Sequence, residues 1–214
     1  MHGKKEGVEA PCGACKADPG KGPARRAFLR GAVAVGASLS MSPSAFAADD
    51  KRDAVDTASD ATALPPQLGD HFVFALGDKQ GEVKVEDLTV GGPQVVAFPM
   101  DPKSGLVRDN SRLNMVILIR YDAADLSAET RAHAADGVVC YTAVCTHQGC
   151  PVSMWSTERK AVFCSCHGSI YDLKDGAQVL DGPAPRPLPA LPLKIDNGAP
   201  AVAGSFTGRV GSQI

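Results

Sequence analysis

The sequence predicts an all-β fold, an antiparallel β-sandwich or open barrel. Of its 214 residues, 44% are hydrophobic, which is enough for a packed core. Aromatic residues make up only 5%, whereas Gly and Pro number 22 and 16, a composition that favours short strands and many turns over a helical bundle. The third observation is a series of short runs rich in Val, Ile, Phe and Tyr that are separated by Gly, Pro, Asp and Asn.

These runs predict the individual elements in chain order. Each is short, β-branched or aromatic in character, and bounded by turn residues. The predicted strands are 71–75, 82–85, 94–98, 115–121, 138–144, 161–164, 191–195 and 200–203. A short helix is predicted over 127–135, and no internal repeat is visible. We therefore predict a single domain over 69–214, preceded by a polar linker over 48–68 that is rich in Ala and Asp.

The first 47 residues have the pattern of an export signal. Arg25 and Arg26 stand in a twin-arginine-like motif, an apolar stretch follows at 31–41, and Ser-Ala-Phe-Ala at 44–47 supplies a small-residue cleavage site. The apolar stretch is shorter than the roughly 20 residues that span a bilayer, so we predict cleavage and a periplasmic location. An uncleaved signal would instead anchor the domain in the membrane. Because the twin-arginine route exports folded proteins, a cofactor inserted before export is implied.

The charge of the exported part excludes some partners. Residues 48–214 hold 15 basic and 21 acidic side chains, a net charge of −6. This balance argues against nucleic acid as a partner. It suits a basic protein partner such as a cytochrome c.

Four of the seven cysteines gather in two short blocks, each of which also contains a histidine. Residues 145–150 read Cys-Thr-His-Gln-Gly-Cys, and residues 164–169 read Cys-Ser-Cys-His-Gly-Ser. Of the other cysteines, Cys140 lies in an apolar run and is interpreted as a small buried hydrophobe. Cys12 and Cys15 lie in the segment predicted to be removed, and we assign them no function in the mature protein.

The spacing within the blocks points to an iron–sulfur cluster. Each block supplies one Cys and one His, whereas zinc sites usually space their ligands C-x₂₋₄-C and H-x₃₋₅-H. A Rieske centre needs this arrangement, because two thiolates bind one of its irons and two imidazoles bind the other. The candidate ligands are Cys145, His147, Cys164 and His167. A zinc site and a purely structural pair of disulfides are the alternatives.

The two blocks resemble those of the Rieske iron–sulfur protein family. The resemblance implies a Rieske-type antiparallel fold with a small cluster-binding subdomain, in which 145–150 and 164–169 are the cluster-binding loops. It implies one [2Fe–2S] cluster per chain on the four candidate ligands. It also implies a disulfide between the remaining cysteines of the blocks, Cys150 and Cys166.

Residues near the blocks match further positions of that family. Ser169 and Tyr171 correspond to hydroxyls that, in high-potential members, bond to a bridging sulfide and to a ligand thiolate. Such donors stabilise the reduced cluster, so we expect a potential on the order of +150 to +300 mV. Two positions depart from the pattern: Ser165 replaces a common Pro, and Gln148 stands where quinol-oxidising subunits usually have Leu. A segment that resembles the family's cluster-covering proline loop comprises Gly182, Pro183, Ala184 and Pro185.

Within the family, the chain resembles the small subunit of arsenite oxidase. The similarity lies in 138–144, 154–163 and 208–214. It implies an electron-transfer subunit that relays single electrons from a larger catalytic subunit, containing molybdenum in that family, to a c-type cytochrome. The chain itself would then carry out no substrate chemistry.

The alternative is the iron–sulfur subunit of a quinol–cytochrome c oxidoreductase, the cytochrome bc complex. Ser169, Tyr171 and the proline loop also suit that complex, whereas Gln148 disfavours docking at its quinol site. A ring-hydroxylating oxygenase is disfavoured, because such enzymes need a large additional domain and the chain has 47 residues after His167. The export signal also disfavours it.

Overall fold

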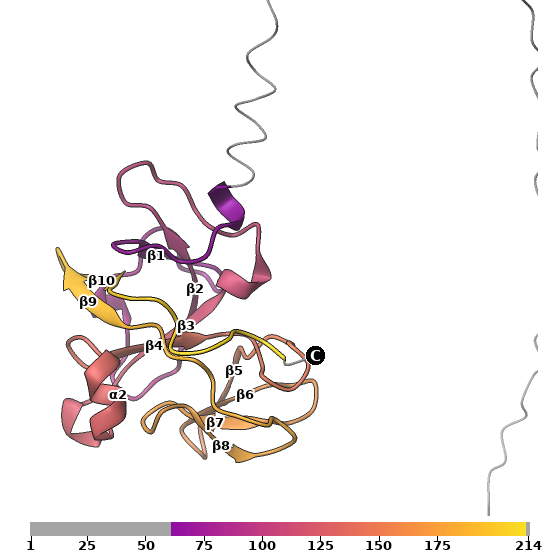
Figure 1. The fold of residues 1–214 in the computed structure, drawn as a ribbon. Coiled ribbons are helices and arrows are strands. Elements are labelled where there is room, and N and C mark those ends of the chain that lie inside the picture. The colour runs from indigo at the N-terminus through magenta and orange to yellow at the C-terminus, as the bar shows by residue number, and fades with distance from the viewer. Residues whose placement is uncertain (1–60, 213–214) are drawn as a thin grey trace, which may run out of the picture. The chain divides into compact units, whose positions relative to one another are not determined.

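Two antiparallel sheets and a separate strand pair form the part of the chain that the computed structural model describes, residues 61–212 (Figure 1). The first sheet runs in the order β1 (His71–Phe74), β2 (Val95–Met100), β3 (Val116–Arg120) and β4 (Val138–Thr142). The second runs in the order β5 (Met154–Ser156), β6 (Ala161–Phe163), β7 (Ile170–Asp172) and β8 (Gln178–Asp181). The pair consists of β9 (Leu193–Asp196) and β10 (Ala199–Val202). The predicted all-β class with antiparallel sheets is confirmed.

Helical segments are short and lie between the strands. The α-helix α2 (Ala128–His133) begins where the sequence predicts it, because the Ser127 hydroxyl accepts the N–H of Thr130 at 3.2 Å and so caps the first turn. Three 3₁₀ turns are η1 (Val85–Asp87), η2 (Arg112–Asn114) and η3 (Ala123–Asp125).

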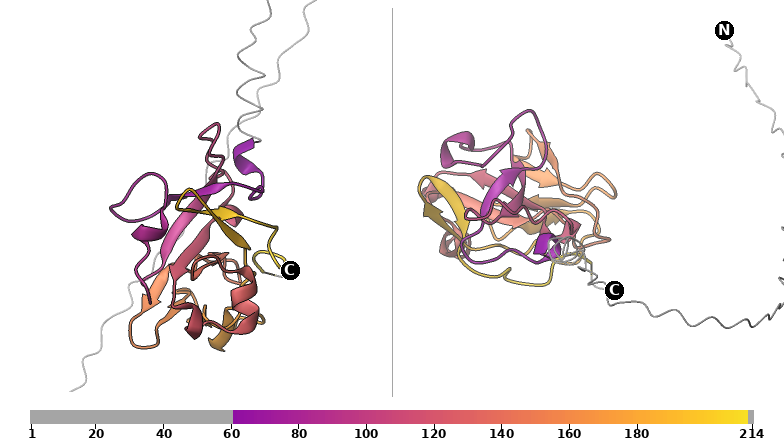
Figure 2. Two further views of the ribbon diagram at one scale, coloured as in Figure 1. Left: turned by 90° about the vertical axis from the view of Figure 1, so that its left-hand side faces the viewer. Right: turned by 90° about the horizontal axis from the view of Figure 1, so that it is seen from above.

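The second sheet is an insertion in a larger strand arrangement. After β4 the chain builds β5–β8 and then returns, so that the N–H of Leu191 donates to the carbonyl of Cys140 in β4 at 2.8 Å. The strand β10 then lies beside the start of β1, where Gly69 donates to Val202 at 2.9 Å. The strands β1–β4 and β9–β10 therefore curl toward an open barrel, and β5–β8 project from one end of it (Figures 1 and 2).

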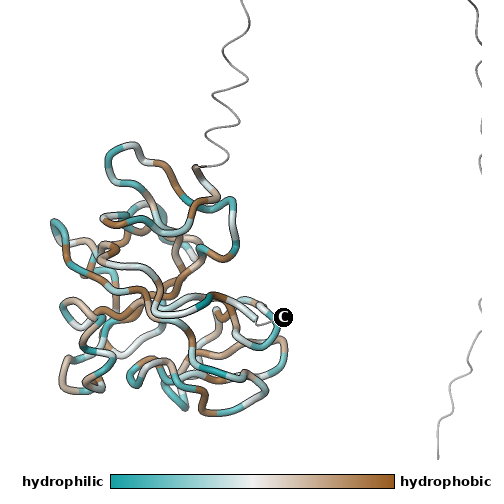
Figure 3. The backbone as a smooth tube through the Cα atoms, in the orientation of Figure 1, coloured by the Kyte–Doolittle hydropathy of each residue, from teal (hydrophilic) through white to brown (hydrophobic). Residues whose placement is uncertain are grey.

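Two hydrophobic cores meet at β3 and β4. Val116 and Leu118 on one face of β3 belong to the barrel core, whereas Ile117 and Ile119 on the other face belong to a core shared with β5–β8. Successive side chains of a strand point to opposite faces, so a strand between two cores must be apolar throughout. This is why the sequence of β3 is a continuous apolar run, and why hydrophobic segments cross the middle of the fold in Figure 3.

Cys140 in β4 packs in the barrel core with 2% of its surface exposed. Burial raises the pKa of its thiol well above the ordinary value. The interpretation of Cys140 as a buried small hydrophobe agrees with this position.

The structure differs from the predicted strands in two places. Residues 82–85 form only an isolated bridge from Glu82 to Val73, because Asp87 accepts the N–H of Lys84 and turns the chain into η1. The strands β5, β7 and β8 were not predicted as strands, since their sequences, MWS, IYD and QVLD, mix polar with apolar residues and form no continuous apolar run.

The predicted signal peptide, with Arg25 and Arg26, and residues 48–60 of the predicted linker lie outside the described residues. The described end of that linker is bonded to the domain: Arg108 donates to the carbonyl of Ala61 at 3.0 Å, and Asn114 donates to that of Leu64 at 2.7 Å. Over residues 61–212, the structure contains no helix that is both long and apolar enough to cross a bilayer.

Candidate metal centre

The two Cys/His blocks form two copies of the same turn. In the first loop, 145–150, the N–H of Cys145 donates to the carbonyl of Cys150 at 2.8 Å, and Gly149 donates back to Cys145 at 2.9 Å. In the second loop, 164–169, Cys164 donates to Ser169 at 2.9 Å, and Gly168 donates back to Cys164 at 3.0 Å. Each turn therefore starts with a cysteine.

Glycine is required at the fifth position of each turn. Gly149 has φ 72° and Gly168 has φ 76°, a left-handed conformation that glycine adopts without a steric cost. The repeated Cys-x₃-Gly spacing is the local sequence signal for both turns.

A disulfide between Cys150 and Cys166 joins the two loops, with a Cα–Cα distance of 6.5 Å. The disulfide implied by the resemblance is thus present. The Sγ atoms of Cys150, Cys164 and Cys166 all lie within 4.8 Å of one another, so the bridge lies directly beside a candidate ligand.

The structure brings the four candidate ligands together at the ends of β4 and β6. Cys145 and Cys164 are buried free thiols, each about 1% exposed. The rings of His147 and His167 are 4.7 Å apart and nearly perpendicular. The Nδ1 atom of His147 is buried and has no hydrogen-bond partner. A buried polar atom without a partner is costly, so a ligand to that nitrogen is expected.

The donor set fits a Rieske cluster. Two buried thiols and two imidazoles, one of them with a free buried nitrogen, are the ligands that such a cluster requires. Burial raises the pKa of the Cys164 thiol, the N–H of Cys166 partly offsets this, and the neighbouring Cys145 raises it further. Because iron binds thiolates, cluster assembly must displace the protons of these thiols.

Tyr171 directs its hydroxyl at the sulfur of Cys145. The two atoms are 3.2 Å apart, and Tyr171 is fully buried. Burial raises the pKa of Tyr171 far above its usual value, so the phenol keeps its proton. It therefore remains a donor throughout the physiological range.

Thr146 determines the direction of this hydrogen bond. The sequence patterns did not identify Thr146 as a site residue. Its hydroxyl donates to the carbonyl of Arg186 at 2.7 Å, so toward Tyr171 the Thr146 oxygen can only accept. Tyr171 lies 3.4 Å from that oxygen, which is long for an O–H···O bond, whereas 3.2 Å to the larger sulfur is a close contact. The Tyr171 proton is thus directed to Cys145. The contact between Thr146 and Arg186 spans 40 residues, so no local pattern could have indicated it.

The predicted proline loop lies against the second cluster-binding loop. The hydroxyl of Ser169 accepts the N–H of Ala184 at 3.1 Å, which leaves the hydroxyl hydrogen of Ser169 free for another acceptor. Gly182 allows the close approach: a Cβ atom there would lie 2.5 Å from the Cα of Ser169. Pro183 and Pro185 are exposed at the surface.

Replacing Gly182 with Ala is expected to destabilise this region by on the order of 1–3 kcal/mol beyond the backbone strain, because the new methyl group collides with the Ser169 backbone. Gly198→Ala is the matched control, since Gly198 has a similar positive φ of 77° but open space around it. Denaturant unfolding of the holoprotein measures the difference. Equal unfolding midpoints for the two variants would contradict the close packing.

The segment after the proline loop is tied to the C-terminal residues. The Arg186 guanidinium donates to the carbonyls of Arg209 at 2.8 Å and Gly211 at 2.5 Å. Gly211 in turn packs on Val144, directly before the first cluster-binding loop. These C-terminal residues therefore support the same side of the site.

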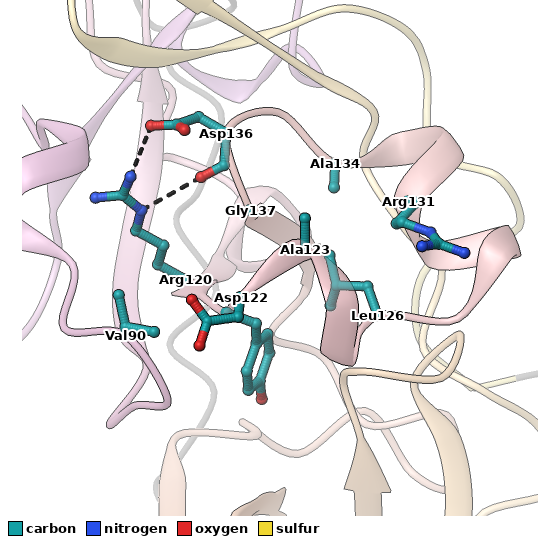
Figure 4. Close-up of a pocket in the computed structure, with 10 residues that line it drawn as sticks. Val90, Arg120, Asp122, Ala123, Leu126, Arg131, Ala134, Asp136 and Gly137 are labelled. Atoms are coloured by element: carbon teal, nitrogen blue, oxygen red, sulfur yellow. Dashed lines mark hydrogen bonds and ion pairs between the residues drawn. The ribbon is translucent and has the colours of Figure 1, made fainter.

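A separate hollow of about 490 Å³ lies between α2 and the edge of β3 (Figure 4). Its charged rim is partly neutralised, since Arg120 and Asp136 form an ion pair of 2.8 Å. It contains none of the candidate ligands. The functional site is therefore assigned to the two loops and not to this hollow.

Several known proteins are similar to this chain. A family model described as "Rieske [2Fe-2S] domain" matches residues 83–192. The cytochrome bc1 complex Rieske iron-sulfur subunit of Streptomyces lividans is 42% identical over 77 residues, which cover 36% of this chain and 45% of that protein. The subunit of the same name from Mycobacterium tuberculosis strain H37Rv is 31% identical over 162 residues, covering 66% and 38%. The chain thus spans less than half the length of either subunit.

A third relative has a different name. The putative respiratory nitrate reductase Rieske subunit of Haloferax mediterranei is 34% identical over 139 residues, covering 64% of this chain and 59% of that protein. Among solved structures, the plasma membrane Rieske protein of Synechocystis PCC 6803 has a TM-score of 0.33, 22% identity and coverage of 52% and 86%. The soluble domain of Rieske protein II from Sulfolobus acidocaldarius has a TM-score of 0.35, 20% identity and coverage of 76% and 78%.

Proposed function

The chain belongs to the Rieske [2Fe–2S] protein family, and from this premise we propose that it is the electron-transfer subunit of an exported oxidoreductase complex. Its cluster would be held by Cys145, His147, Cys164 and His167. The observation that carries the proposal is the buried, unpartnered Nδ1 of His147 beside two buried free thiols. Export rests on the N-terminal sequence pattern alone.

The bound cluster supplies a one-electron couple whose potential depends on ligands, hydrogen bonds and solvent exposure. The chain supplies the surroundings. Burial of both thiols and the disulfide beside them limits the access of water to the sulfur side. His167 is exposed and His147 half-buried, so the imidazole edges are where a partner protein can approach most closely.

The direct test is a redox titration of the purified holoprotein followed by EPR. We expect a reversible one-electron couple with a Rieske-type signal, at a potential on the order of +150 to +300 mV. A chain that binds iron but shows no reversible couple would refute the electron-transfer role.

The hydrogen bonds from Ser169 and Tyr171 are expected to raise this potential. Ser169→Ala removes the free hydroxyl hydrogen, and Tyr171→Phe removes the donor to Cys145. A charge-assisted hydrogen bond contributes about 1.5–3 kcal/mol, so each variant should lower the potential by roughly 60–130 mV. The measurement is the same redox titration. An unchanged potential in Ser169→Ala would remove the hydrogen-bond argument for that residue.

For the partner, we favour a larger catalytic subunit, as in complexes that resemble arsenite oxidase, which would pass electrons through this chain to a c-type cytochrome. Gln148 supports this choice, because it lies exposed beside His147 where an apolar residue would suit a quinol site. One relative is named as the Rieske subunit of a putative respiratory nitrate reductase. This name is compatible with a partner other than a cytochrome bc complex. Purification of the native complex with metal analysis tests it, and molybdenum in a co-purifying large subunit is the expected result.

A cytochrome bc complex is the second candidate. Several relatives carry that name, including the one that is 42% identical over 77 residues. Cytochrome b in the purified complex, together with quinol-dependent reduction of the cluster, would support this reading over the first.

A further inference from the structure

Three arginines lie on segments that contact the first cluster-binding loop directly or through one another, and we call them the loop 1 rim: Arg112, Arg186 and Arg209. Neither cluster-binding loop, 145–150 or 164–169, contains a Lys, Arg, Asp or Glu residue. The electrostatic potential at the imidazole edges is therefore set by the neighbouring segments that carry these arginines.

Arg112 is the rim residue in direct contact with the loop. Its guanidinium donates to the carbonyl of Gly149 at 2.7 Å, only two residues from His147. A Cβ atom on Gly149 would lie 3.3 Å from the same guanidinium. No acidic partner of Arg112 occurs among residues 61–212, so its positive charge is not neutralised by an ion pair there.

Arg186 and Arg209 extend the rim on the same side. The carbonyl of Arg186 binds Thr146, which lies between two candidate ligands in the sequence, and its guanidinium holds the carbonyl of Arg209. The Arg209 side chain is itself exposed, and only its backbone is used in this contact. Neither arginine forms an ion pair with an acid in the described part of the chain.

Two acids on neighbouring segments form no ion pair with the rim arginines. Asp181, at the start of the proline loop, is already matched by Arg159 at 3.5 Å. Glu129 on α2 lines the same cavity as Arg186 but forms no ion pair with it. The local charge at the first loop is thus positive, although residues 48–214 carry a net charge of −6.

We propose that the loop 1 rim is the docking face for the electron-accepting protein, and that the acceptor meets it with an acidic surface around its redox centre. The inference rests on the proposed electron-transfer function and specifies the chemistry of its partner. It reverses the expectation from net charge, which favoured a basic cytochrome c.

Screening explains why the rim outweighs the net charge. The Debye length is about 10 Å at 0.1 M ionic strength, so charges on the distant barrel are largely screened at the imidazole edges. The Arg112 guanidinium bonds to Gly149, in the same loop as His147, and is therefore screened less than those distant charges. Local charges of this kind govern the rate of encounter and the choice of partner.

Small redox ions test the sign of the local field. One electron passes from the reduced holoprotein to ferricyanide, which becomes ferrocyanide, or to the cationic cobalt(III) tris(phenanthroline), which becomes the cobalt(II) complex. We expect the ferricyanide rate constant to fall as ionic strength rises from about 50 to 300 mM, and the cobalt rate constant to rise. The opposite pair of slopes would overturn the proposal.

Arg209→Glu is the decisive variant, because it leaves the backbone carbonyl bound by Arg186 unchanged. It should lower the ferricyanide rate constant roughly threefold or more at low ionic strength. Lys194→Glu on β9 makes the same charge change away from the cluster-binding loops and is the matched control. Equal effects of the two variants would show that only net charge matters.

A protein pair then tests the acidic acceptor. Cytochrome c carries lysines around its haem edge, and succinylation replaces their positive charges with negative ones. The two forms therefore present the same haem within surfaces of opposite charge. We expect the succinylated form to oxidise the holoprotein faster at low ionic strength, and faster oxidation by the unmodified form would overturn the inference. If the holoprotein has a normal one-electron couple but reacts faster with unmodified cytochrome c, only the proposed docking face is refuted. If the one-electron couple is missing, the proposed electron-transfer function is refuted.

Discussion

Replacing His147 with Ala should abolish the [2Fe–2S] cluster. The Nδ1 atom of His147 is buried without a hydrogen-bond partner, and the ring lies 4.7 Å from that of His167. With one imidazole removed, the second iron keeps a single protein ligand from the pair that a Rieske centre needs. Alanine also leaves an open position through which water can reach the iron. We expect iron content to fall from two atoms per chain toward none.

EPR of the reduced protein and iron analysis measure this loss. His133→Ala is the matched control, because His133 is a half-buried histidine at the end of α2 that contacts neither loop's ligands. That variant should keep the full signal. An intact Rieske EPR signal in the His147 variant would falsify the ligand assignment, and with it the site proposed here.

Removing the disulfide should give the second large effect, on stability. In the double variant Cys150→Ser and Cys166→Ser, the two loops keep their own turns but lose the covalent link between them. The linked cysteines are 16 residues apart, for which loop-closure entropy predicts a loss of about 3 kcal/mol. Because the bridge lies within 4.8 Å of the Cys164 sulfur, we also expect faster loss of iron.

Two measurements separate these consequences. Denaturant unfolding gives the stability, and the decay of the visible absorbance in the presence of an iron chelator gives the rate of cluster loss. Cys140→Ala is a useful control, since it removes a cysteine from the barrel core without touching the loops. If the double variant unfolded at the wild-type midpoint and released iron at the wild-type rate, the bridge would have no structural role.

Local sequence patterns determined the parts of this protein that depend on neighbours along the chain. All but the last residue of β3 and of β4 are apolar because these strands lie between two cores, and such runs are visible without any structure. One Cys and one His in close spacing in each block, Cys145 with His147 and Cys164 with His167, identified the candidate ligands for the same reason. Each block forms one turn, closed by hydrogen bonds within six residues.

Contacts between distant segments were decided only by the tertiary structure. The bond from Thr146 to Arg186 joins residues 40 positions apart, and nothing in either local sequence marks it. The proline loop was expected from the family resemblance, but the close approach of Gly182 to the Ser169 backbone was not. The short strands β7 and β8 exist because they pair with each other and with β6, since three or four residues have little strand preference alone.

The charge at the site likewise depends on the tertiary structure, whereas the net charge depends on composition alone. Composition determined a net charge of −6 for residues 48–214 and so predicted a basic partner. Folding links Arg112, Arg186 and Arg209 to one loop through hydrogen bonds, although 97 residues separate the first of them from the last. Net charge is a sum that ignores position, whereas a partner protein responds to the charges within about one Debye length of its contact. The candidate ligands of this protein could thus be proposed from its sequence, but the face it presents to a partner is a property of the fold.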